Sequence, residues 1–562
     1  MISKLKINES AKRLYYQKGW WTSDTIPDAW NRVAREHPEK TYVKDDRGVS
    51  YTYASCDEVA ERIAAWLAAV GVRSGDVVTF QLPTWADFCP VFLGVAKAGA
   101  VMHPVARNYN VRDLSFIMNA VGSRAFICPT FHHRSDHERQ ALECLTHVPT
   151  LAPERIMVLD SDAHRAREGF ITLEEVKGTF GRTPEPPRPS SDDVACILST
   201  SGTTGKPKQA MLTHNNILFS ERAFVKGLPL DESSVMFMPS PLNHATGFFH
   251  GLISPFLLGG TTVLQQDFSA RAAIEIMNDE RATWSMGATP FVYDILNALE
   301  ADEASVPTLK LFLSGGAPLP SSLVERARTH GIALCECYGS TESCPHAYVP
   351  PERCQEWNGR WSGIALEGVE MRIVDKSRRE VARGVCGEEA SRGPHVFVGY
   401  LGEPTLTDEV LDDDGWFYSG DLGIMDDEGR LSIRGRIKEI IIRGGENISM
   451  LEVDEAVDGW PATLAHAAIG APDERMGERI CLFAVPRPGF ERSFTLEDLT
   501  SYLREKGVSK RLWPERIELI EAIPRTSTGK VRRQELTERL QSAEKRRSPE
   551  RDKEDDHVTA NV

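Results

Sequence analysis

The chain has 562 residues, too many for one compact core, so we expect a large composite body and at least one smaller domain. Its formal net charge of -16 at pH 7 excludes a general nucleic-acid binder, although one nucleotide can still occupy a locally basic cleft. No N-terminal run has the length of a signal peptide, and no stretch approaches the roughly 20 apolar residues that span a bilayer. We therefore expect a cytoplasmic protein with no integral membrane segment.

Short apolar runs alternate with amphipathic helical stretches from about residue 50 to 440. This alternation predicts α/β sheets with parallel strands. The apolar run from Cys89 to Val105 is interrupted by polar residues and prolines, and we interpret it as a buried strand–helix segment. We expect strands at 77–82, 125–128, 155–159, 194–198 and 309–313, and helices at 57–70, 111–121, 270–277 and 321–330.

Two composition shifts divide the rest of the chain. The Pro-rich stretch 183–193 predicts a surface linker, and the shift at 435–439 opens about 100 residues with their own alternation, which predicts a separate small α/β domain. The highly charged end beyond residue 540 favours a solvated, disordered tail over an interaction tail. In the small domain we expect strands at 440–442, 480–485 and 516–519, and helices at 451–457 and 496–506.

The eleven cysteines are scattered along the chain. They form no CxxC pair and no Cys/His cluster at zinc spacing. Without an export signal, we interpret them as reduced thiols.

The segment STSGTTGKPK, Ser199–Lys208, follows an apolar strand directly. Its glycines allow backbone N–H groups to surround phosphate oxygens, its hydroxyls can donate or reach a metal, and its lysines supply charge. A flexible surface loop is the alternative, but linkers seldom follow a buried strand so abruptly. A Walker A loop needs glycine five residues before Gly205 and a hydroxyl after Lys206, whereas this chain has Thr200 and Pro207. The segment therefore predicts a phosphate loop of another kind.

This loop resembles the signature of the adenylate-forming (AMP-binding) superfamily, which includes acyl-CoA synthetases, peptide-synthetase adenylation domains and luciferases. Gln209 departs from the pattern, because these enzymes usually carry glycine after Pro-Lys; the departure would alter how the loop moves without abolishing phosphate contact. The likeness covers roughly residues 20 to 540. Six more segments resemble the family in the required order: PLNHATGFFHG (241–251), LSGGAPLP (313–320), CYGSTES (337–343), WFYSGDLG (416–423), GRIKEIIIRGGENIS (435–449) and PRTSTGKVRR (524–533).

The resemblance implies an α/β fold of the acyl-CoA synthetase type. Its large N-terminal domain would contain two α/β subdomains plus a β-barrel-like subdomain, and a small C-terminal α/β domain would move about a hinge at Lys438. We therefore expect an AMP-binding domain over 1–435, a C-terminal domain over 436–540 and a charged tail over 541–562.

The resemblance also implies ATP, Mg²⁺ and coenzyme A as cofactors. Thr200 and Glu342 would share the Mg²⁺, and hard oxygen ligands of this kind suit that ion. Tyr338 would pack on adenine and Asp421 would accept the ribose hydroxyls. The residues expected to contact ATP or CoA are Thr200, Ser201, Gly202, Thr203, Thr204, Gly205, Lys208, Gly315, Gly316, Ala317, Tyr338, Gly339, Ser340, Thr341, Asp421, Arg436, Arg443, Gly444 and Gly445.

Three residues are implied in the chemistry besides the metal ligands. Lys530 would be the lysine of the adenylation step, and Lys438 would be the hinge between the two steps. His244, in the segment that resembles the acyl site, is a candidate base for the thiol step. The Arg443–Gly445 loop would meet the pantetheine arm of CoA.

These features imply an AMP-forming carboxylic acid–thiol ligase, which makes an acyl-adenylate and then acyl-CoA. Segments 214–223, 285–296 and 390–400 most resemble bacterial short- and medium-chain fatty-acid–CoA ligases, and alicyclic-acid–CoA ligases are nearly as similar. The expected acyl-site stretches 244–251, 286–290 and 314–317 lack a fixed charge, which favours an uncharged aliphatic or ring tail over a diacid or amino acid.

Several alternatives stay open at this point. An adenylation enzyme that loads a carrier protein, a luciferase-like oxygenase and a non-enzymatic ATP-binding protein share parts of the pattern. A monomer and a homodimer are equally compatible with the sequence, and so is peripheral membrane contact. The expected partner is a small carboxylic acid, and no nucleic acid is expected.

Overall fold

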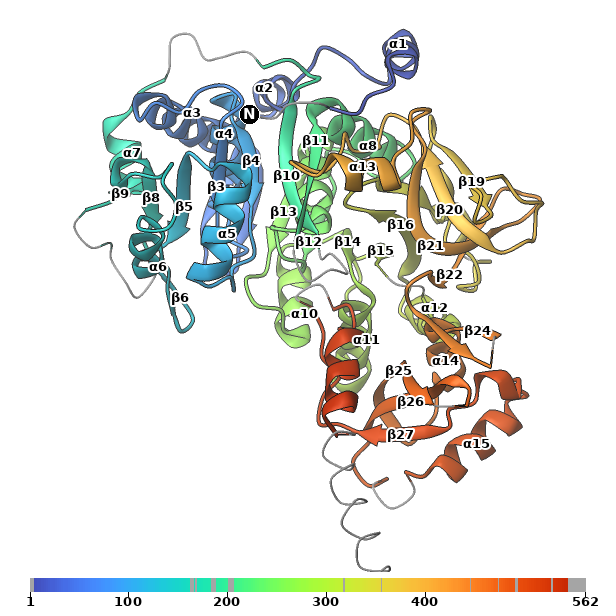
Figure 1. Ribbon diagram of the computed structural model, residues 1–562. Coiled ribbons are helices and arrows are strands. Elements are labelled where there is room, and N and C mark those ends of the chain that lie inside the picture. Colours follow the sequence, from blue (N-terminus) through green and yellow to red (C-terminus); the bar gives the residue numbers. More distant parts are fainter. Residues whose placement is uncertain are drawn as a thin grey trace, which may run out of the picture. The chain divides into compact units, whose positions relative to one another are not determined.

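The computed structural model describes residues 5–161, 166, 169–182, 189–200, 207–316, 319–354, 356–444, 446–473, 475–490, 494–526 and 529–543 (Figure 1). The chain forms two compact units. Unit 1 comprises Met1–Arg372, Ala390–Ser419 and Gly429–Leu431, and unit 2 comprises Ile373–Glu389, Gly420–Glu428 and Ser432–Val562. Two stretches before residue 435 thus group with the smaller unit, and the boundary at 435/436 stays a prediction.

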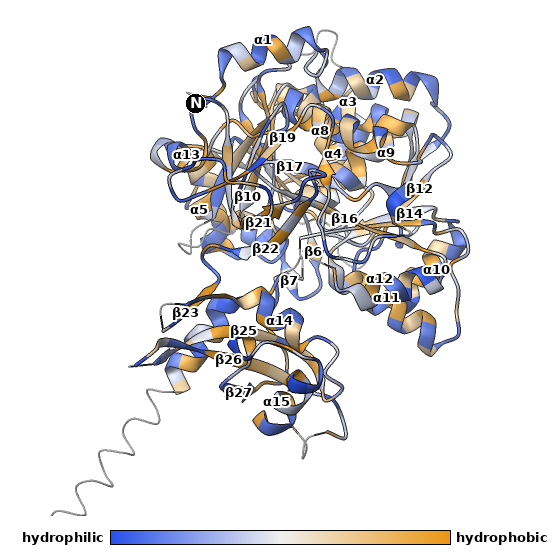
Figure 2. Cartoon of the chain, turned by 90° about the vertical axis from the view of Figure 1, so that its right-hand side faces the viewer, coloured by the Kyte–Doolittle hydropathy of each residue, from blue (hydrophilic) through white to orange (hydrophobic). Residues whose placement is uncertain are grey.

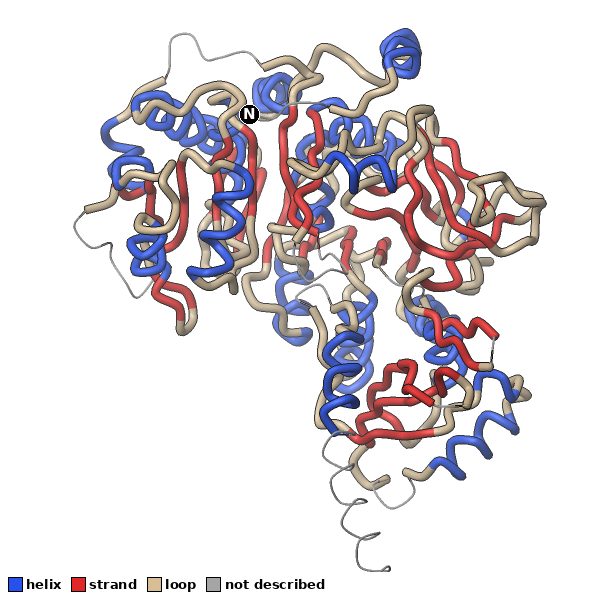
Figure 3. The backbone as a smooth tube through the Cα atoms, in the orientation of Figure 1, coloured by secondary structure: helices blue, strands red, loops and turns tan. Residues whose placement is uncertain are grey.

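A seven-stranded sheet forms one half of unit 1, in the order β11-β10-β4-β3-β5-β8-β9. The strands from β4 to β9 are parallel, and β10 pairs in parallel with β4 but antiparallel with β11. Helices flank these strands (Figure 3). The strands are β3 (Val77–Phe80), β4 (Val101–Pro104), β5 (Ala125–Pro129), β8 (Ile156–Leu159), β9 (Ile171–Thr172), β10 (Val194–Thr200) and β11 (Lys208–Thr213).

Helix α4 (Phe88–Lys97) lies wholly inside this half of the unit. A helix that is apolar all round is a buried one, and α4 is mostly orange in Figure 2, whereas α15 (Leu496–Glu505) alternates blue and orange as a half-exposed helix does. The buried ammonium of Lys97 lies 2.7 Å from Glu61 and 2.9 Å from Asp57, so its charge is compensated. The segment predicted from 89 to 105 is therefore confirmed as buried, with the helix before the strand.

A nine-stranded sheet forms the other half, in the order β18-β17-β16-β15-β14-β12-β13-β1-β2. Its central strands are parallel, so their carboxyl ends meet at one edge of the sheet. The strands are β1 (Thr41–Asp45), β2 (Ser50–Thr52), β12 (Val235–Met238), β13 (Thr261–Leu264), β14 (Trp284–Gly287), β15 (Leu311–Gly315), β16 (Ala333–Ser340), β17 (Cys344–Tyr348) and β18 (Ile364–Ala365).

The described helices of unit 1 follow the predicted alternation. None of the described helices is long and apolar enough to cross a membrane. They are α1 (Glu9–Gln17), α2 (Ile26–Glu36), α3 (Tyr53–Ala69), α4, α5 (Val111–Val121), α6 (His137–Cys144), α7 (Leu173–Thr179), α8 (His214–Lys226), the π-helix η2 (Thr246–Ile253), α9 (Ser254–Leu258), α10 (Ala270–Asp279), α11 (Thr289–Ala301), α12 (Ser321–Thr329) and α13 (Pro404–Val410).

A four-stranded sheet, β19-β20-β21-β22, occupies the stretch where the resemblance implies a β-barrel-like subdomain. Unit 2 has a five-stranded sheet in which β24, β23, β26 and β25 are neighbours in that order and β27 pairs with β26. These elements are β19 (Glu370–Val374), β20 (Gly387–Arg392), β21 (Phe417–Met425), β22 (Leu431–Arg436), β23 (Ile440–Arg443), β24 (Glu446–Ser449), α14 (Met450–Val457), β25 (Thr463–Asp473), β26 (Gly477–Pro486), α15 and β27 (Arg516–Leu519). The predicted α/β fold class, with a large N-terminal and a smaller C-terminal domain, is confirmed.

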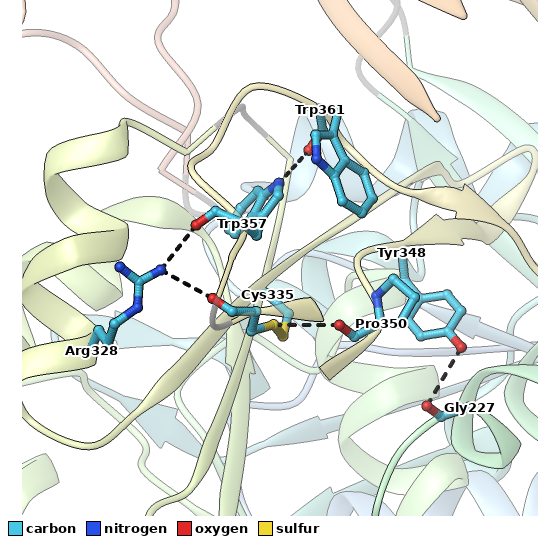
Figure 4. The surroundings of a disulfide bond; sticks show 8 residues. Gly227, Arg328, Cys335, Tyr348, Pro350, Trp357 and Trp361 are labelled. Carbon is cyan, nitrogen blue, oxygen red and sulfur yellow. Dashed lines mark hydrogen bonds between the residues drawn. A yellow bond between two sulfur atoms is a disulfide. The ribbon is translucent and has the colours of Figure 1, made fainter. Parts of the chain in front are cut away.

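The cysteines require a correction. Cys335 and Cys354 form a disulfide (Figure 4). The other nine cysteines, all among the described residues, are free. The expectation of eleven reduced thiols is therefore wrong for this pair. Cys335 lies on β16 and Cys354 lies nineteen residues later, where Arg328 donates to its carbonyl oxygen at 3.1 Å. The chain reversal that joins them gives no local sequence signal.

Candidate active site

The phosphate loop grows out of the hairpin formed by β10 and β11. Its last two described rungs pair Ser199 with Gln209 and Thr200 with Lys208. The hydroxyl of Ser199 donates to Oε1 of Gln209 at 3.0 Å. These pairs hold the two ends of the loop on neighbouring strands. The predicted residues Ser201, Gly202, Thr203, Thr204 and Gly205 lie outside the described residues.

Glu342, the predicted metal ligand, lies in the turn between β16 and β17. Its Oε1 accepts a hydrogen bond of 2.7 Å from the hydroxyl of Tyr400. Tyr400 also pairs with Ala210 of β11, and the ammonium of Lys208 lies 4.9 Å from the centre of its ring. One aromatic residue thus joins the predicted metal ligand to the strand that leaves the phosphate loop.

The donor set fits Mg²⁺. Thr200 offers a hydroxyl and Glu342 a carboxylate, and Mg²⁺ takes few protein oxygens of this kind beside substrate phosphates. Burial first, and then the charge of Glu342, raise the pKa of Tyr400, so its hydroxyl stays protonated and keeps donating to Oε1. The second carboxylate oxygen of Glu342 is thereby left for a cation.

The segments predicted to hold adenine meet on neighbouring strands. Gly315 of β15 pairs with Cys337 of β16, one residue before Tyr338. The ring of Tyr338 packs edge-on against His346 of β17, with the ring centres 5.0 Å apart. A side chain at Gly339 would place its Cβ 1.8 Å from the carbonyl oxygen of Cys344, so glycine is required there. Gly316 and Ser340 lie beside these positions and Thr341 adjoins Glu342, whereas Ala317 is outside the described residues.

The segment that resembles an acyl site leads into the π-helix η2 and contains its first turns. His244 precedes η2, and its Nδ1 accepts from the N–H of Thr246 at 3.4 Å. A Cβ at Gly247 would lie 2.1 Å from the carbonyl oxygen of Pro241, so the close turn needs glycine. Phe248 is fully buried. The segment is therefore packed tightly against the end of β12.

A buried carboxylate holds the following turns of η2. Oε2 of Glu221, on α8, accepts from the hydroxyl of Ser254 at 2.6 Å and lies 2.9 Å from Nδ1 of His250. Wide π-turns are frequently found at functional sites. This cluster was missed by sequence reasoning, because α8 and η2 are separate elements and buried polar residues give no periodic signal.

Asp421 and Arg436, both in unit 2, contact each other. The guanidinium Nε of Arg436 lies 2.9 Å from Oδ1 of Asp421, whose side chain is largely buried. The adjacent N–H of Gly420 donates to Glu388 at 3.0 Å. The two residues predicted for the same ribose thus come together, Asp421 from the middle of β21 and Arg436 from the end of β22.

Arg443 turns into unit 2 instead of toward solvent. Its guanidinium donates to the carbonyl oxygen of Arg511 at 2.9 Å and to Glu515 at 3.4 Å. Gly444 is exposed in the turn between β23 and β24, and Gly445 lies outside the described residues. The exposed part of the predicted CoA loop is therefore its backbone at the turn.

Lys530 is exposed in a turn closed by Thr526. The N–H of Thr526 donates to the carbonyl oxygen of Lys530 at 2.8 Å, and the N–H of Lys530 donates back to Oγ1 of Thr526 at 3.1 Å. Lys438 lies between β22 and β23, next to Glu439, which pairs with Arg533 at 3.2 Å. The predicted hinge segment and the Lys530 segment are thus anchored within the same unit.

Unit 1 brings together the phosphate hairpin with Glu342 and, on neighbouring strands, the adenine segments. Unit 2 holds Asp421, Arg436, Lys438, Arg443, Gly444 and Lys530. Sequence reasoning missed Tyr400 as part of the site. Its segment was used only as a mark of likeness, and a separation of 58 residues from Glu342 leaves no pattern to detect.

Comparison with known proteins shows the family to which the chain belongs. The model of the AMP-binding enzyme family matches residues 30–401, and the model of the AMP-binding enzyme C-terminal domain matches residues 452–530. The chain is 39% identical to the medium-chain fatty-acid–CoA ligase of Escherichia coli K12, over 94% of this chain and 93% of that one. It is 31% identical to the feruloyl-CoA synthase of an Amycolatopsis species, over 91% and 98%.

A solved structure shares the fold. ATP-bound MatB from Rhodopseudomonas palustris superposes with a TM-score of 0.82 at 25% identity, covering 92% of this chain and 99% of that one. The family models together cover most of the chain, in the order of the motifs described above. The chain therefore belongs to the AMP-binding enzyme family, as an acyl-CoA synthetase of the AMP-forming carboxylic acid–thiol ligases.

Proposed function

We propose that this enzyme activates a medium- or short-chain fatty acid, or an alicyclic acid, with ATP and transfers the acyl group to coenzyme A. AMP and pyrophosphate are the other products. The E. coli relative is named as a medium-chain fatty-acid–CoA ligase and the Amycolatopsis relative as a feruloyl-CoA synthase, so these two relatives are named for different acids.

The proposal rests on the edge of the nine-stranded sheet where β12, β14, β15 and β16 end, because the predicted acyl and adenine segments meet there. Gly287 pairs with Ser314, and Gly315 pairs with Cys337, so the predicted acyl and adenine segments adjoin through strand register. The described acyl-site stretches, 244–251, 286–290 and 314–316, contain no Asp, Glu, Lys or Arg. Such a wall suits an uncharged tail, because a second charge on the acid would find no countercharge.

The adenylation step joins a carboxylate to the α-phosphorus of ATP, two groups that repel each other. Lys208 supplies positive charge at the phosphate hairpin, and the bound Mg²⁺ would supply more, held by Thr200 and Glu342. Tyr400 fixes the orientation of the Glu342 carboxylate. Backbone at Gly315 and the ring of Tyr338 position the adenine, so that the reacting atoms meet in line.

Unit 2 provides the remaining groups of the proposal. Asp421 accepts the ribose hydroxyls, and the guanidinium of Arg436 holds the Asp421 carboxylate in place. Lys530 stabilises the charge that develops during adenylation and then leaves, as unit 2 turns about Lys438. The exposed turn at Gly444 then meets the pantetheine arm, and the CoA thiol displaces AMP. His244 stays the candidate for accepting the thiol proton.

A panel of acids tests the proposal. The purified enzyme is given ATP, Mg²⁺, CoA and straight-chain acids of four to sixteen carbons, together with cyclohexanecarboxylate, benzoate, ferulate, a diacid and amino acids; AMP and thioester are both measured. We expect kcat/KM to be highest among the short to medium straight-chain or alicyclic acids, with AMP and thioester in equal amounts. A preference for the diacid or for amino acids would contradict it.

A carrier-loading assay separates the main alternative. The same enzyme is given ATP, the preferred acid and a phosphopantetheinylated carrier protein in place of CoA. The proposal expects CoA to be the better acceptor. Rapid carrier loading with negligible acyl-CoA formation would instead assign the chain to stand-alone adenylation enzymes.

A further inference from the structure

A row of buried polar side chains crosses the seven-stranded sheet below the phosphate loop. Thr79 on β3, His103 on β4 and Gln209 on β11 are each at most 5% exposed. Side chains two residues apart on a strand share one face of the sheet. The residues two positions away on the same strands, Val77, Val101 and Met211, pack in one apolar cluster, which places the polar row on that same face.

The carbonyl oxygen of Ala125 fixes which group donates in each hydrogen bond of this row. The carbonyl oxygen of Ala125 can only accept, so Ser123 donates to it at 3.0 Å. Ser123 must then accept from Thr79, at 2.8 Å, and Thr79 must in turn accept from Nδ1 of His103, at 2.9 Å. His103 therefore carries its proton on Nδ1 and offers Nε2 as an acceptor.

His103 is neutral in this arrangement of hydrogen bonds. Burial lowers its pKa to about 4, and the side chain of Gln209 is the group that opposes this shift. A neutral imidazole has one donor and one acceptor nitrogen, and the bond to Thr79 occupies the donor. The acceptor nitrogen, facing away from Thr79, still needs an N–H.

Two buried nitrogens at this place complement each other. In the part of the chain that the structure describes, Nε2 of His103 and Nε2 of Gln209 are both buried without a hydrogen-bond partner. One is an acceptor and the other is an amide donor. If both nitrogens stayed without a hydrogen bond, each would carry an uncompensated desolvation cost. A hydrogen bond between them satisfies both. The other end of the amide, Oε1, already accepts from Ser199.

We propose that Gln209 is a positioning residue of the phosphate loop: its amide nitrogen donates to Nε2 of His103 while its oxygen holds the hydroxyl of Ser199. The resulting chain runs from the backbone of Ala125 through Ser123, Thr79, His103 and Gln209 to Ser199. It ties the base of the loop to the interior of the sheet.

This role explains the departure from the family pattern at this position. Glycine, which the family usually carries, can make neither bond. Ser199 and Gln209 form a rung next to the loop, so the chain of bonds restricts the ends of the loop and not the loop itself. Its effect on ATP rests on the proposed function, whereas the chain of bonds does not.

The replacement Gln209→Met tests the role, because methionine has a similar size and no polar group that can bridge His103 and Ser199. Amide hydrogen exchange at residues 197–200 and 208–211, measured without ligands, should become about 10-fold faster, as expected for loss of buried hydrogen bonds. KM for ATP should rise about 3- to 10-fold, with kcat nearly unchanged. Gln265→Met is the matched control. Gln265 is equally buried, follows the end of β13 in the nine-stranded sheet and donates to the carbonyl oxygen of Ser269, so neither quantity should change.

A second replacement, Gln209→Glu, should cause defects that depend on pH. A merely structural role of Gln209 would not predict such a dependence. The carboxylate can accept from Ser199 but cannot donate to neutral His103. The bond forms once His103 is protonated, which the carboxylate favours. The defects in exchange and in KM should therefore be large at pH 8 and shrink at pH 6, whereas those of Gln209→Met should be similar at both values.

Thr79→Val provides a test away from the loop. It preserves shape but removes the acceptor that fixes the proton on Nδ1 of His103. Exchange at 197–200 should again rise, although β4 separates the strand of Thr79 from β10. Wild-type exchange in Gln209→Met and Thr79→Val, or the same pH response in Gln209→Glu and Gln209→Met, would overturn the proposal. The exchange measurements contain no ATP, so they keep their meaning if the ligase function fails.

Discussion

The hydroxyl of Tyr400 donates a 2.7 Å hydrogen bond to Oε1 of Glu342. Tyr400 is 4% exposed, and its ring lies against the ammonium of Lys208. Tyr400 therefore fixes the positions of two charged groups, the carboxylate of Glu342 and the ammonium of Lys208. The structure thus connects the two sides of the predicted phosphate and metal site through a residue that carries no charge.

Replacing Tyr400 by phenylalanine should weaken metal binding while leaving the fold intact. The carboxylate of Glu342 would lose the group that orients it, and loss of such supporting hydrogen bonds typically costs about 10–100-fold in metal affinity. Binding of Mn²⁺ in the presence of a non-hydrolysable ATP analogue, followed by electron paramagnetic resonance, measures this directly. The Mg²⁺ concentration for half-maximal activity should rise in parallel.

Tyr53→Phe is the control for that measurement. Tyr53 is fully buried and donates to the carbonyl oxygen of Gly260 at 2.8 Å, at the far strands of the nine-stranded sheet. It should lower the midpoint of thermal unfolding and leave Mn²⁺ affinity unchanged. Equal Mn²⁺ affinity in wild type and Tyr400→Phe would refute the orienting role.

Lys530→Ala should separate the two half-reactions. Loss of a charge stabiliser predicts a fall in adenylate formation on the order of 10²–10³-fold, because the repulsion between carboxylate and triphosphate is no longer offset. Thioester formation from supplied acyl-adenylate should be largely unaffected. Single-turnover assays with each starting compound measure the two steps. Lys376, an exposed lysine elsewhere in unit 2, gives the control Lys376→Ala, and equal loss in both steps would contradict the role.

Stability should fall as the pH is lowered from about 6.5 to 4. Burial lowers the pKa of His103, His132, His137 and His214 to about 4 from an ordinary 6.5. Between these values the unfolded chain binds protons that the folded chain does not, so acid favours unfolding, by up to about 3 kcal/mol for a fully buried histidine.

Urea unfolding at several pH values tests this expectation through tryptophan fluorescence. His214→Gln removes one of the four groups and should make the free energy of unfolding depend less steeply on pH in this window. An unfolding free energy that is constant or rises on acidification would show that these histidines are protonated in the folded chain.

The disulfide predicts a thiol count. Unfolding in denaturant without reductant should expose nine thiols to an alkylating agent, and prior reduction should expose eleven. Peptide mass spectrometry should place the two additional alkylated sites at Cys335 and Cys354. Eleven thiols under both conditions would mean that the pair is reduced in the protein as isolated.

Much of the fold was predictable from local pattern. The runs around β3, β5 and β8 and the helices α5 and α10 follow the apolar period of their element type, so their bounds agree within a few residues. Strand β25 was missed. Its sequence, TLAHAAIGAPD, is rich in alanine, which disfavours strands, and what makes it a strand is its long antiparallel register with β26.

The predicted site residues came from ordered motifs, and motifs name residues without saying what each side chain contacts. Arg443 was expected to meet CoA, but its guanidinium is taken up by Glu515 and a backbone carbonyl. No sequence motif of recognisable spacing marks Tyr400, Glu221 or the partners of Gln209. Their roles come from strand register and burial, which bring distant parts of the chain together.

The central claim is that an acid is activated as its adenylate before CoA takes part. Acid-dependent exchange of labelled pyrophosphate into ATP, measured without CoA, tests it most directly. The account predicts exchange that requires both the acid and Mg²⁺, and an enzyme-bound acyl-adenylate that is converted to thioester when CoA is added. Absence of exchange with every acid that supports turnover, or release of ADP and phosphate in place of AMP and pyrophosphate, would contradict it.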